Sequence, residues 1–227
     1  MSQADFNSLF LTLKLALVTT ALLLVISLPL AYWISRSGSK LKILIEAFVS
    51  LPLILPPTVI GFYLLLALGP RGPIGSVSFY LWGKTLAFSF WGLVIGSICY
   101  SLPFVVQPIK NAFESIDSDL LDQASCLGAS PLDRFFSVIL PLSRPGILTG
   151  SVLGFAHTIG EFGVVLMIGG NIPGKTQVVS ISIYEHVENL EYASAHLLSA
   201  ILLVLCFALL VLVYGLNRKF SVVHHEH

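Results

Sequence analysis

The sequence is poor in charged residues. Of its 227 residues only 11% are Asp, Glu, Lys or Arg, against about 25% in ordinary globular chains. The 12 basic and 12 acidic residues cancel, so the composition gives no sign of a nucleic-acid partner. The three cysteines, Cys99, Cys126 and Cys206, lie far apart and show neither metal-ligand nor redox spacing. We therefore expect neither a water-soluble domain nor a resident metal.

Sequence motifs for catalysis are also missing. The chain has no GxxxxGK[ST] sequence, so we expect that it does not hydrolyse ATP itself. It shows no paired catalytic carboxylates and no nucleophile–base constellation, and we assign no catalytic residue. His224, His225 and His227 stand close together at the end of the sequence. We interpret them as part of a flexible tail, 220–227, rather than as a metal site.

Long apolar runs make up most of the chain. Hydrophobic residues form 56% of it, the mean hydropathy is +0.90, and several runs are long enough to cross a hydrocarbon core of about 30 Å. In lipid the backbone must satisfy its own hydrogen bonds, so such runs cross as helices. The sequence predicts an all-α, polytopic membrane protein, with a transmembrane domain over 7–219. About five spans are expected: 10–33, 43–68, 86–106, 147–168 and 196–214.

The basic residues predict the orientation, because cytoplasmic loops carry an excess of Lys and Arg. The segments after the first, third and fifth spans are the richer ones, which places the N-terminus outside and the C-terminus in the cytoplasm. An odd number of spans requires the same arrangement. The basic residues in question are Arg36, Lys40, Lys42, Lys110, Arg134, Arg144, Arg218 and Lys219.

Prolines interrupt the second expected span. Pro52, Pro56 and Pro57 fall within six residues of one another, and Gly61 follows. Each proline removes a backbone donor and clashes with the preceding turn, so this helix must be kinked or unwound. A static kink that aids packing is one interpretation. We favour the other, a pore-lining helix that can move, and place Pro56 and Pro57 in a translocation path or gate.

The fourth expected span carries two ionisable residues, His157 and Glu161, which lie four positions apart and so share one helix face. An ionisable group at membrane depth costs about 3 kcal/mol or more, and such groups usually face a bundle interior or a wet cavity. We expect His157 to donate a hydrogen bond to Glu161. The pair is either a polar contact that fixes helix packing or, with Phe162 and Gly163, part of a path or gate.

The polar stretch 111–144 between the third and fourth spans predicts a helical hairpin. Asp119–Leu127 reads as one short helix, which Gly128 ends. Ser130 is the expected N-cap of a second helix, with Pro131 at its first position and Asp133 three residues after the cap; Pro141 is expected to end it. Both helices carry apolar faces, which either pack on the protein itself or dock a soluble partner.

This hairpin resembles the cytoplasmic motif of the permease subunits of bacterial ABC importers. That motif runs Glu-Ala-Ala, three residues, Gly, nine residues, Ile, one residue, Leu-Pro; here Asp, Gln and Val are departures at three positions, with the spacing kept. In that family the loop inserts into the ATP-hydrolysing subunit and transmits its closure. The resemblance implies a docking surface formed by Asp122, Gln123, Ala124, Gly128, Ala129, Ser130, Val138, Leu140 and Pro141.

Two other stretches narrow the resemblance. Leu51–Gly75 is similar to the molybdate permeases, and Gly154–Gln177 is similar to the molybdate and sulfate permeases, which share a Gly-Glu-Phe-Gly core. The chain is thus identified as a member of the molybdate ABC-transporter permeases. That implies a homodimer in the bacterial inner membrane, with two ATP-binding subunits that hold ATP and Mg, and a periplasmic or lipid-anchored oxyanion-binding protein. No cofactor is expected on this chain.

The substrate implied by the resemblance is a tetrahedral oxyanion, molybdate foremost. Sulfate and tungstate remain alternatives, because both are dianions of similar shape. An ionised Glu161 would repel a dianion, so we do not assign it as a ligand. An ion-coupled secondary carrier with a His157–Glu161 proton relay is the other alternative, although such carriers usually contain internal repeats, which this sequence lacks.

Overall fold

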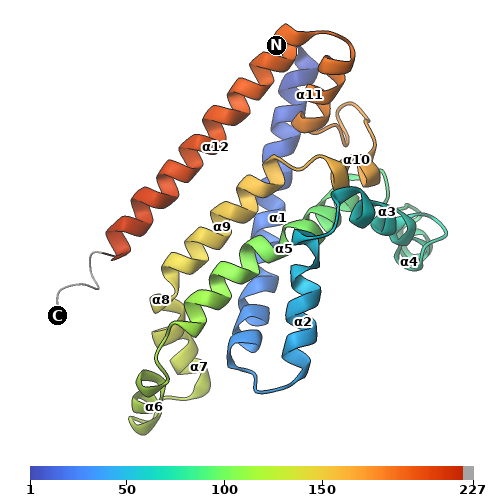
Figure 1. Cartoon of the computed structure of the whole chain (residues 1–227). Coiled ribbons are helices and arrows are strands. Elements are labelled where there is room, and N and C mark those ends of the chain that lie inside the picture. Colours follow the sequence, from blue (N-terminus) through green and yellow to red (C-terminus); the bar gives the residue numbers. More distant parts are fainter. Residues whose placement is uncertain (222–227) are drawn as a thin grey trace.

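The computed structural model describes residues 1–221, and within that range it is helical, without a strand. Four long helices form an elongated bundle (Figure 1): α1 (Gln3–Arg36), α5 (Phe90–Glu114), α9 (Arg144–Ile159) and α12 (Tyr192–Ser221). Helix α1 packs along α5 and α9, while α12 lies against α9 and α11 (Val179–Glu188). The sequence-based prediction of an all-α chain is confirmed for the described residues.

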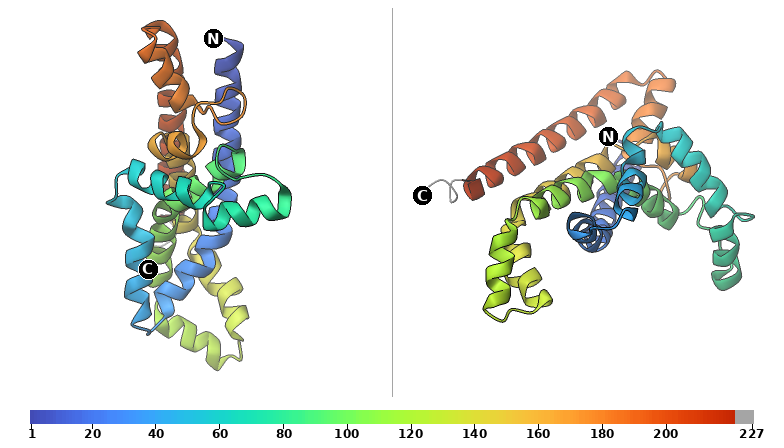
Figure 2. Two further views of the ribbon diagram at one scale, coloured as in Figure 1. Left: turned by 90° about the vertical axis from the view of Figure 1, so that its right-hand side faces the viewer. Right: turned by 60° about the horizontal axis from the view of Figure 1, so that its bottom comes forward.

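The shorter elements lie at the two ends and on one side of this bundle. Helix α2 (Leu41–Ser50), the 3₁₀ turn η1 (Leu51–Leu53) and α3 (Pro57–Leu68) follow α1, and α4 (Pro73–Trp82) precedes α5. Figure 2 shows α3 and α4 projecting sideways from the bundle. Between α5 and α9 lie α6 (Ser118–Cys126), α7 (Pro131–Arg134), the π-helical turn η2 (Phe135–Ile139) and α8 (Leu140–Leu142); α10 (Gly163–Gly169) follows α9.

Three helices are long and apolar enough to cross a membrane: α1, α5 and residues Tyr192–Gly215 of α12. They cover the first and fifth expected spans and most of the third, 86–106, whose helix begins only at Phe90. Two bent helix pairs could add a span each, which would bring the total to five: Leu41–Leu53 with Pro57–Leu68, bent by 110°, and Pro131–Leu142 with Arg144–Ile159, bent by 68°. The prediction of a polytopic chain is confirmed, and the described residues provide three to five spans.

The second expected span, 43–68, is broken rather than kinked. Its two halves meet at 110°, with Pro56 at the N-cap of α3 and Pro57 at its first helical position. Neither proline has an amide hydrogen to donate, and at this pair the helix ends and the chain restarts in a new direction. A proline at the first helical position costs nothing there, because that amide would be unpaired in any case.

The fourth expected span, 147–168, is wrong as one continuous helix. Helix α9 ends at Ile159 and α10 begins at Gly163. The intervening Glu161 is held from both sides, since its carboxylate accepts a hydrogen bond from Ser97 of α5 and its carbonyl accepts one from Ser180 of α11. These side-chain bonds, together with the low helix propensity of the flanking glycines, stabilise the break.

The C-terminal helix α12 extends to Ser221. Its last two residues therefore belong to the segment 220–227 that the sequence predicts as a flexible tail. The remainder of that tail, with His224, His225 and His227, lies outside the described residues.

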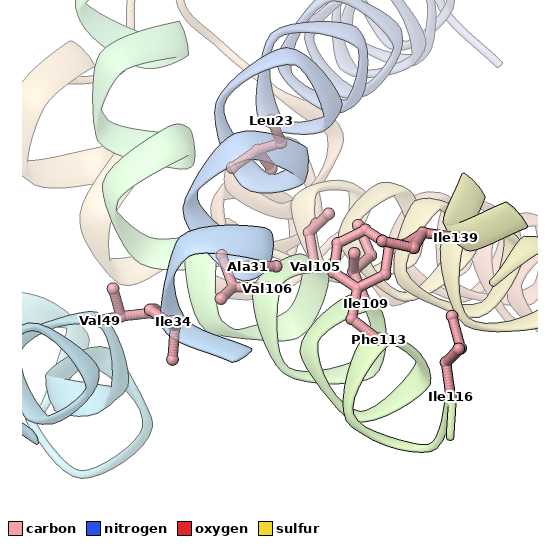
Figure 3. Packing of buried hydrophobic residues seen from close by; sticks show 10 residues of the cluster. All are labelled: Leu23, Ala31, Ile34, Val49, Val105, Val106, Ile109, Phe113, Ile116 and Ile139. Atoms are coloured by element: carbon pink, nitrogen blue, oxygen red, sulfur yellow. The ribbon is translucent and has the colours of Figure 1, made fainter. Parts of the chain in front are cut away.

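The largest buried apolar cluster joins α1 to α5 near the hairpin (Figure 3). Residues of α1 and α5 meet along the contact. One residue each from α2 and η2 completes the group, together with Ile116, two positions after the end of α5. The members are Leu23, Ala31, Ile34, Val49, Val105, Val106, Ile109, Phe113, Ile116 and Ile139. Because Ile139 and its neighbours belong to the hairpin, this core anchors the hairpin to the bundle.

Candidate functional site

The two helix breaks touch one another. A Cβ atom added to Gly163, at the start of α10, would lie 2.8 Å from the Cβ of Pro57, at the start of α3. One turn further along α3, a Cβ on Gly61 would lie 2.7 Å from the Cβ of Met167. Small residues permit this approach, as they do at other helix contacts in membranes. Segments about a hundred residues apart in the sequence thus meet at a single place.

A cavity of about 530 Å³ opens beside the two breaks. Of the six residues predicted for a translocation path or gate, only Pro56 is not part of its lining; it caps α3 next to Pro57. Its wall combines apolar side chains with a few polar groups from α3, α5 and the α9–α10 segment. The lining residues are Pro57, Thr58, Tyr100, Ala156, His157, Gly160, Glu161, Phe162, Gly163, Leu166 and Met167. Their role in transport stays a prediction.

Glu161 is a buried residue in the α9–α10 break that is hydrogen-bonded to two other helices. Only 3% of the residue is exposed. Its Oε2 accepts a hydrogen bond from Ser97 Oγ at 2.6 Å, and its main-chain oxygen accepts one from Ser180 Oγ at 2.6 Å. Its other carboxylate oxygen, Oε1, has no hydrogen-bond partner among the described residues. Glu161 therefore ties the break between α9 and α10 to both α5 and α11.

The expected hydrogen bond between His157 and Glu161 is wrong. His157 Nδ1 instead lies 2.9 Å from Ser101 Oγ, and its ring stacks on Phe104 with 3.9 Å between centroids. The physical reason is the break: α9 ends at Ile159, so residues 157 and 161 no longer share one helix face. Each finds a serine of α5 as its partner instead.

Sequence reasoning missed these serines, Ser97 and Ser101. They lie four residues apart on α5 and are both fully buried. A spacing of four places two hydroxyls on one helix face, which is the only signal that the sequence offers. Serine occurs commonly at helix contacts in membranes, so nothing in the sequence distinguishes these two from other serines in the spans.

The hairpin follows its predicted local structure. Helix α6 spans Ser118–Cys126, and Gly128 has a φ of +86°, a conformation that favours glycine. Ser130 caps α7, because its hydroxyl accepts from the Asp133 amide while the Asp133 carboxylate accepts from the Ser130 amide. The predicted glycine stop and capping box are both confirmed.

The predicted end of the second hairpin helix, Pro141, is wrong. The helical run continues to Leu142 and includes the π turn η2. In that turn the Leu140 amide bonds to the carbonyl of Phe135, five residues earlier. The next residue, Pro141, sits within the first two positions of the short helix α8, where a missing amide hydrogen is tolerated.

The apolar side chains of the hairpin divide into a packed group and an exposed group. Leu121, Phe135 and Ile139 pack against the α1–α5 core. In contrast, Leu127 is 89% exposed and Leu132 is 69% exposed. The hairpin is therefore anchored on one side and presents apolar side chains on the other.

The residues predicted for docking are spread along the hairpin. Asp122 and Gln123 line a shallow depression on α6, and Leu140 and Pro141 line a second one near the start of α9. Gly128 forms the turn and Ser130 caps α7. The remaining three, Ala124, Ala129 and Val138, are half-buried. Their role in docking stays a prediction.

The family described as binding-protein-dependent transport system inner membrane component matches residues 7–222. The chain belongs to this family. It is accordingly a multi-pass permease of the inner membrane.

Several relatives of the permease carry names that specify a substrate. The chain is 54% identical to the molybdenum transport system permease protein ModB of Azotobacter vinelandii, and the alignment covers 97% of both chains. It is 35% identical to the Escherichia coli K12 protein of the same name, over 83% of this chain and 82% of that one. A probable sulfate transport system permease protein of Zygnema circumcarinatum is 35% identical, over 92% of this chain and 72% of the relative.

Solved ABC transporters share the fold of the permease. One is a bacterial alginate ABC transporter in complex with a periplasmic protein, with a TM-score of 0.78 at 18% identity, covering 97% of this chain and 81% of that one. Another is an inward-facing methionine ABC transporter, with a TM-score of 0.73 at 17% identity, covering 96% of this chain and 99% of that one. At these identities the likeness concerns the fold alone.

The permease also has a cluster of polar residues at the end opposite the hairpin. His186 of α11 lies between two carboxylates: its Nε2 is 2.8 Å from Asp5 Oδ1 and its Nδ1 is 2.7 Å from Glu191 Oε2. The hydrogen bond with Asp5 raises the pKa of His186 above its ordinary value of 6.5, and the hydrogen bond with Glu191 adds a smaller increase. When protonated, this imidazole joins the start of α1 to the α11–α12 connection.

Proposed function

We propose that the permease carries molybdate across the bacterial inner membrane as the transmembrane subunit of an ATP-driven importer. The observation that carries this proposal is the 54% identity to a molybdenum transport permease over 97% of both chains. The alignment therefore spans the segments that form the broken helices, the cavity and the hairpin of this chain. The cavity beside the breaks is the path that we assign to the anion.

The chemistry of the cavity suits a passage rather than a tight binding site. Most of its lining is apolar, and α3 begins at its edge with Thr58 in the first turn. The start of a helix presents a positive partial charge, which favours an arriving anion. Glu161 is not a ligand in this proposal, because an ionised carboxylate would repel a dianion. Its bonds to Ser97 and Ser180 support a structural or gating role.

We infer that ATP hydrolysis takes place on partner subunits. The permease would act as a homodimer with two ATP-binding subunits, which hold ATP and Mg, and with an extracytoplasmic oxyanion-binding protein. The exposed apolar side chains and the capped turn of the hairpin support docking to those subunits. An exposed apolar surface on a folded hairpin outside the lipid marks a protein-interaction site.

Sulfate is the second candidate substrate, because sulfate permeases are also similar along most of the chain. Uptake of radiolabelled molybdate by proteoliposomes that contain the complete transporter distinguishes the two. We expect uptake that unlabelled molybdate and tungstate suppress and that sulfate suppresses only in large excess. Equal suppression by sulfate would assign the permease to sulfate instead, and uptake driven by an ion gradient without ATP would favour a secondary carrier.

Docking can be tested with two glycines that differ in one respect. A Cβ at either Gly128 or Gly38 meets no atom within 4 Å, but only Gly128 has a positive φ, +86°. A β-branched residue at positive φ is strained, so Gly128→Val distorts the turn of the hairpin. We expect Gly128→Val to lose co-purification with the ATP-binding subunit, whereas Gly38→Val retains it. Equal retention by both variants would contradict the docking role.

A further inference from the structure

Three elements meet where the hairpin joins the bundle. Arg36, in the last turn of α1, donates from Nη2 to the carbonyl of Phe113 at 2.9 Å and to that of Ile116 at 3.4 Å. Those two carbonyls belong to the C-terminal end of α5 and to the residue that leads into the hairpin. A cation at this position satisfies acceptors that a helix end leaves unpaired and complements the negative end of its dipole.

An aromatic cluster lies beside that contact. The ring of Tyr32, one turn before Arg36, is edge-on to Phe113 of α5 at 6.0 Å and to Phe135 of η2 at 5.1 Å, measured between centroids. Phe113 and Phe135 are edge-on to each other at 6.3 Å. The three rings therefore form a closed triangle with one member from each element. Edge-to-face pairs at these distances are mutually attractive and geometrically specific.

This triangle is the point at which α1 touches the second helical run of the hairpin. Phe113 is fully buried, and Ile139, one helical turn beyond Phe135, packs into the same core (Figure 3). Closely packed interiors have low compressibility and transmit displacement. Helix α1 continues without a break from Arg36 to Gln3 and packs along α5 and α9, which line the cavity.

We propose that Tyr32, Arg36, Phe113 and Phe135 form a joint that passes movement of the hairpin to α1 and α5. The proposal rests on the proposed function, since it assumes that a partner moves the hairpin. Arg36 fixes the end of α5 to α1, and the three rings fix η2 to both. These are positioning residues: none of them lines the cavity beside the helix breaks. Loosening the joint leaves the hairpin docked but uncouples its movement from the movement of the helices around the cavity.

The experiment measures molybdate uptake and ATP hydrolysis in the same reconstituted transporter. Arg36→Gln removes the charged donor, and Tyr32→Leu removes one of the three rings of the triangle. We expect uptake per ATP hydrolysed to fall about fivefold or more in each, the scale of a typical coupling between sites. Hydrolysis and co-purification with the ATP-binding subunit should stay within about twofold of wild type, because the docking surface is intact.

Two matched controls accompany these variants. Lys40→Gln removes an exposed cation four residues beyond Arg36 whose side chain makes no capping bond, and Tyr32→Phe keeps the ring. Both should retain the wild-type uptake per ATP. The proposal is overturned if Arg36→Gln and Tyr32→Leu keep the wild-type ratio of uptake to hydrolysis, whether or not both rates fall. If Arg36→Gln fails to assemble, Arg36→Lys replaces it: a lowered ratio supports the joint and a wild-type ratio refutes it.

Failure of the joint is distinguishable from failure of the proposed function. If the permease is not a molybdate importer, the wild-type complex shows no ATP-driven molybdate uptake, before any variant is compared. If only the joint is wrong, the wild-type complex transports molybdate and all four variants keep its ratio of uptake to hydrolysis. A double-mutant cycle between Tyr32→Leu and Phe135→Leu then measures the ring contact directly, and additive effects would contradict it.

Discussion

A single buried carboxylate, Glu161, ties the α9–α10 break to two other helices. Its environment is costly for an ionised group, since one of its oxygens lacks a partner among the described residues. What stabilises the residue is the hydrogen bond from Ser97 and the bond from Ser180 to its main chain. The carboxylate can therefore be replaced by an amide of the same shape more easily than by a smaller side chain.

For Glu161 we expect different results from Gln and from Ala. Glu161→Gln keeps an oxygen that can accept from Ser97, so its melting temperature should match that of the wild type or exceed it. Glu161→Ala leaves the buried Ser97 hydroxyl without this partner, at a cost of about 1–3 kcal/mol. Thermal unfolding in detergent measures both. A Gln variant as unstable as the Ala variant would show that the negative charge itself holds the break.

His186 predicts a dependence of stability on pH. Its pKa is raised in the folded protein by Asp5 and, to a smaller degree, Glu191, so its contribution is complete below about pH 6.5 and is lost as the pH rises through the raised value. We expect wild type to exceed His186→Gln in melting temperature by about 2–4 °C at pH 5.5, for an ion pair of about 1 kcal/mol.

The comparison needs a high-pH arm and a matched histidine. At pH 9 the difference between wild type and His186→Gln should shrink, because neutral His186 can donate to only one of its two carboxylates. His196→Gln, which changes an exposed histidine near the start of α12, should leave the melting temperature unchanged at both pH values. A constant difference across the pH range would exclude the protonated bridge.

Among the elements, the contact between the two helix breaks makes the sharpest prediction. A Cβ on Gly163 would lie 2.8 Å from the rigid ring of Pro57, while one on Gly160 meets nothing closer than 3.8 Å. Overpacking of this kind costs about 1–3 kcal/mol. We expect Gly163→Ala to lower the melting temperature and to reduce uptake, and Gly160→Ala, which meets no such clash, to have a clearly smaller effect on both. The pair separates close packing from helix propensity, because both variants replace glycine with alanine.

The elements that could be predicted from the sequence are those that local chemistry determines. The caps and the turn of the hairpin follow from Ser130, Asp133 and Gly128, whose side chains or backbone conformations act within a few residues. The break after Ile159 could not be predicted, because Ser97 and Ser180, which stabilise it, belong to distant helices. For the same reason the partner of His157 was missed. The prolines did predict an interruption of the second span, but not that its two halves would meet at 110°.

At the scale of the whole molecule, the hairpin and the His186 cluster lie at opposite ends of the bundle (Figure 1). The distribution of Lys and Arg predicts that the hairpin end is cytoplasmic. Native Cys126 is exposed on α6, and Gly174 lies in an open loop between α10 and α11, where a Cβ meets no atom. Positions 126 and 174 can therefore be labelled to determine which end of the bundle faces which side of the membrane.

We expect a membrane-impermeant thiol reagent to reach Cys126 only in inverted vesicles. In a background without the native cysteines, Gly174→Cys should react in right-side-out vesicles. Both results follow from an N-terminus outside and a C-terminus in the cytoplasm. Reaction of Cys126 from the outer side would reverse the orientation and move the proposed ATPase docking to the wrong compartment. Cys206 lies within α12, in the fifth expected span, and should stay unreactive in either preparation because the reagent does not enter the hydrocarbon.

The broken helices have a consequence for the barrier that the membrane maintains. Backbone groups freed at a break are tolerated at such depth where water or protein satisfies them, and the cavity of about 530 Å³ beside Pro57 and Gly163 has room for water. Any opening of that cavity to both sides at once would short-circuit the proton gradient. We therefore expect the tight contacts at Gly61, Gly96 and Gly169 to help seal the protein against leakage of ions.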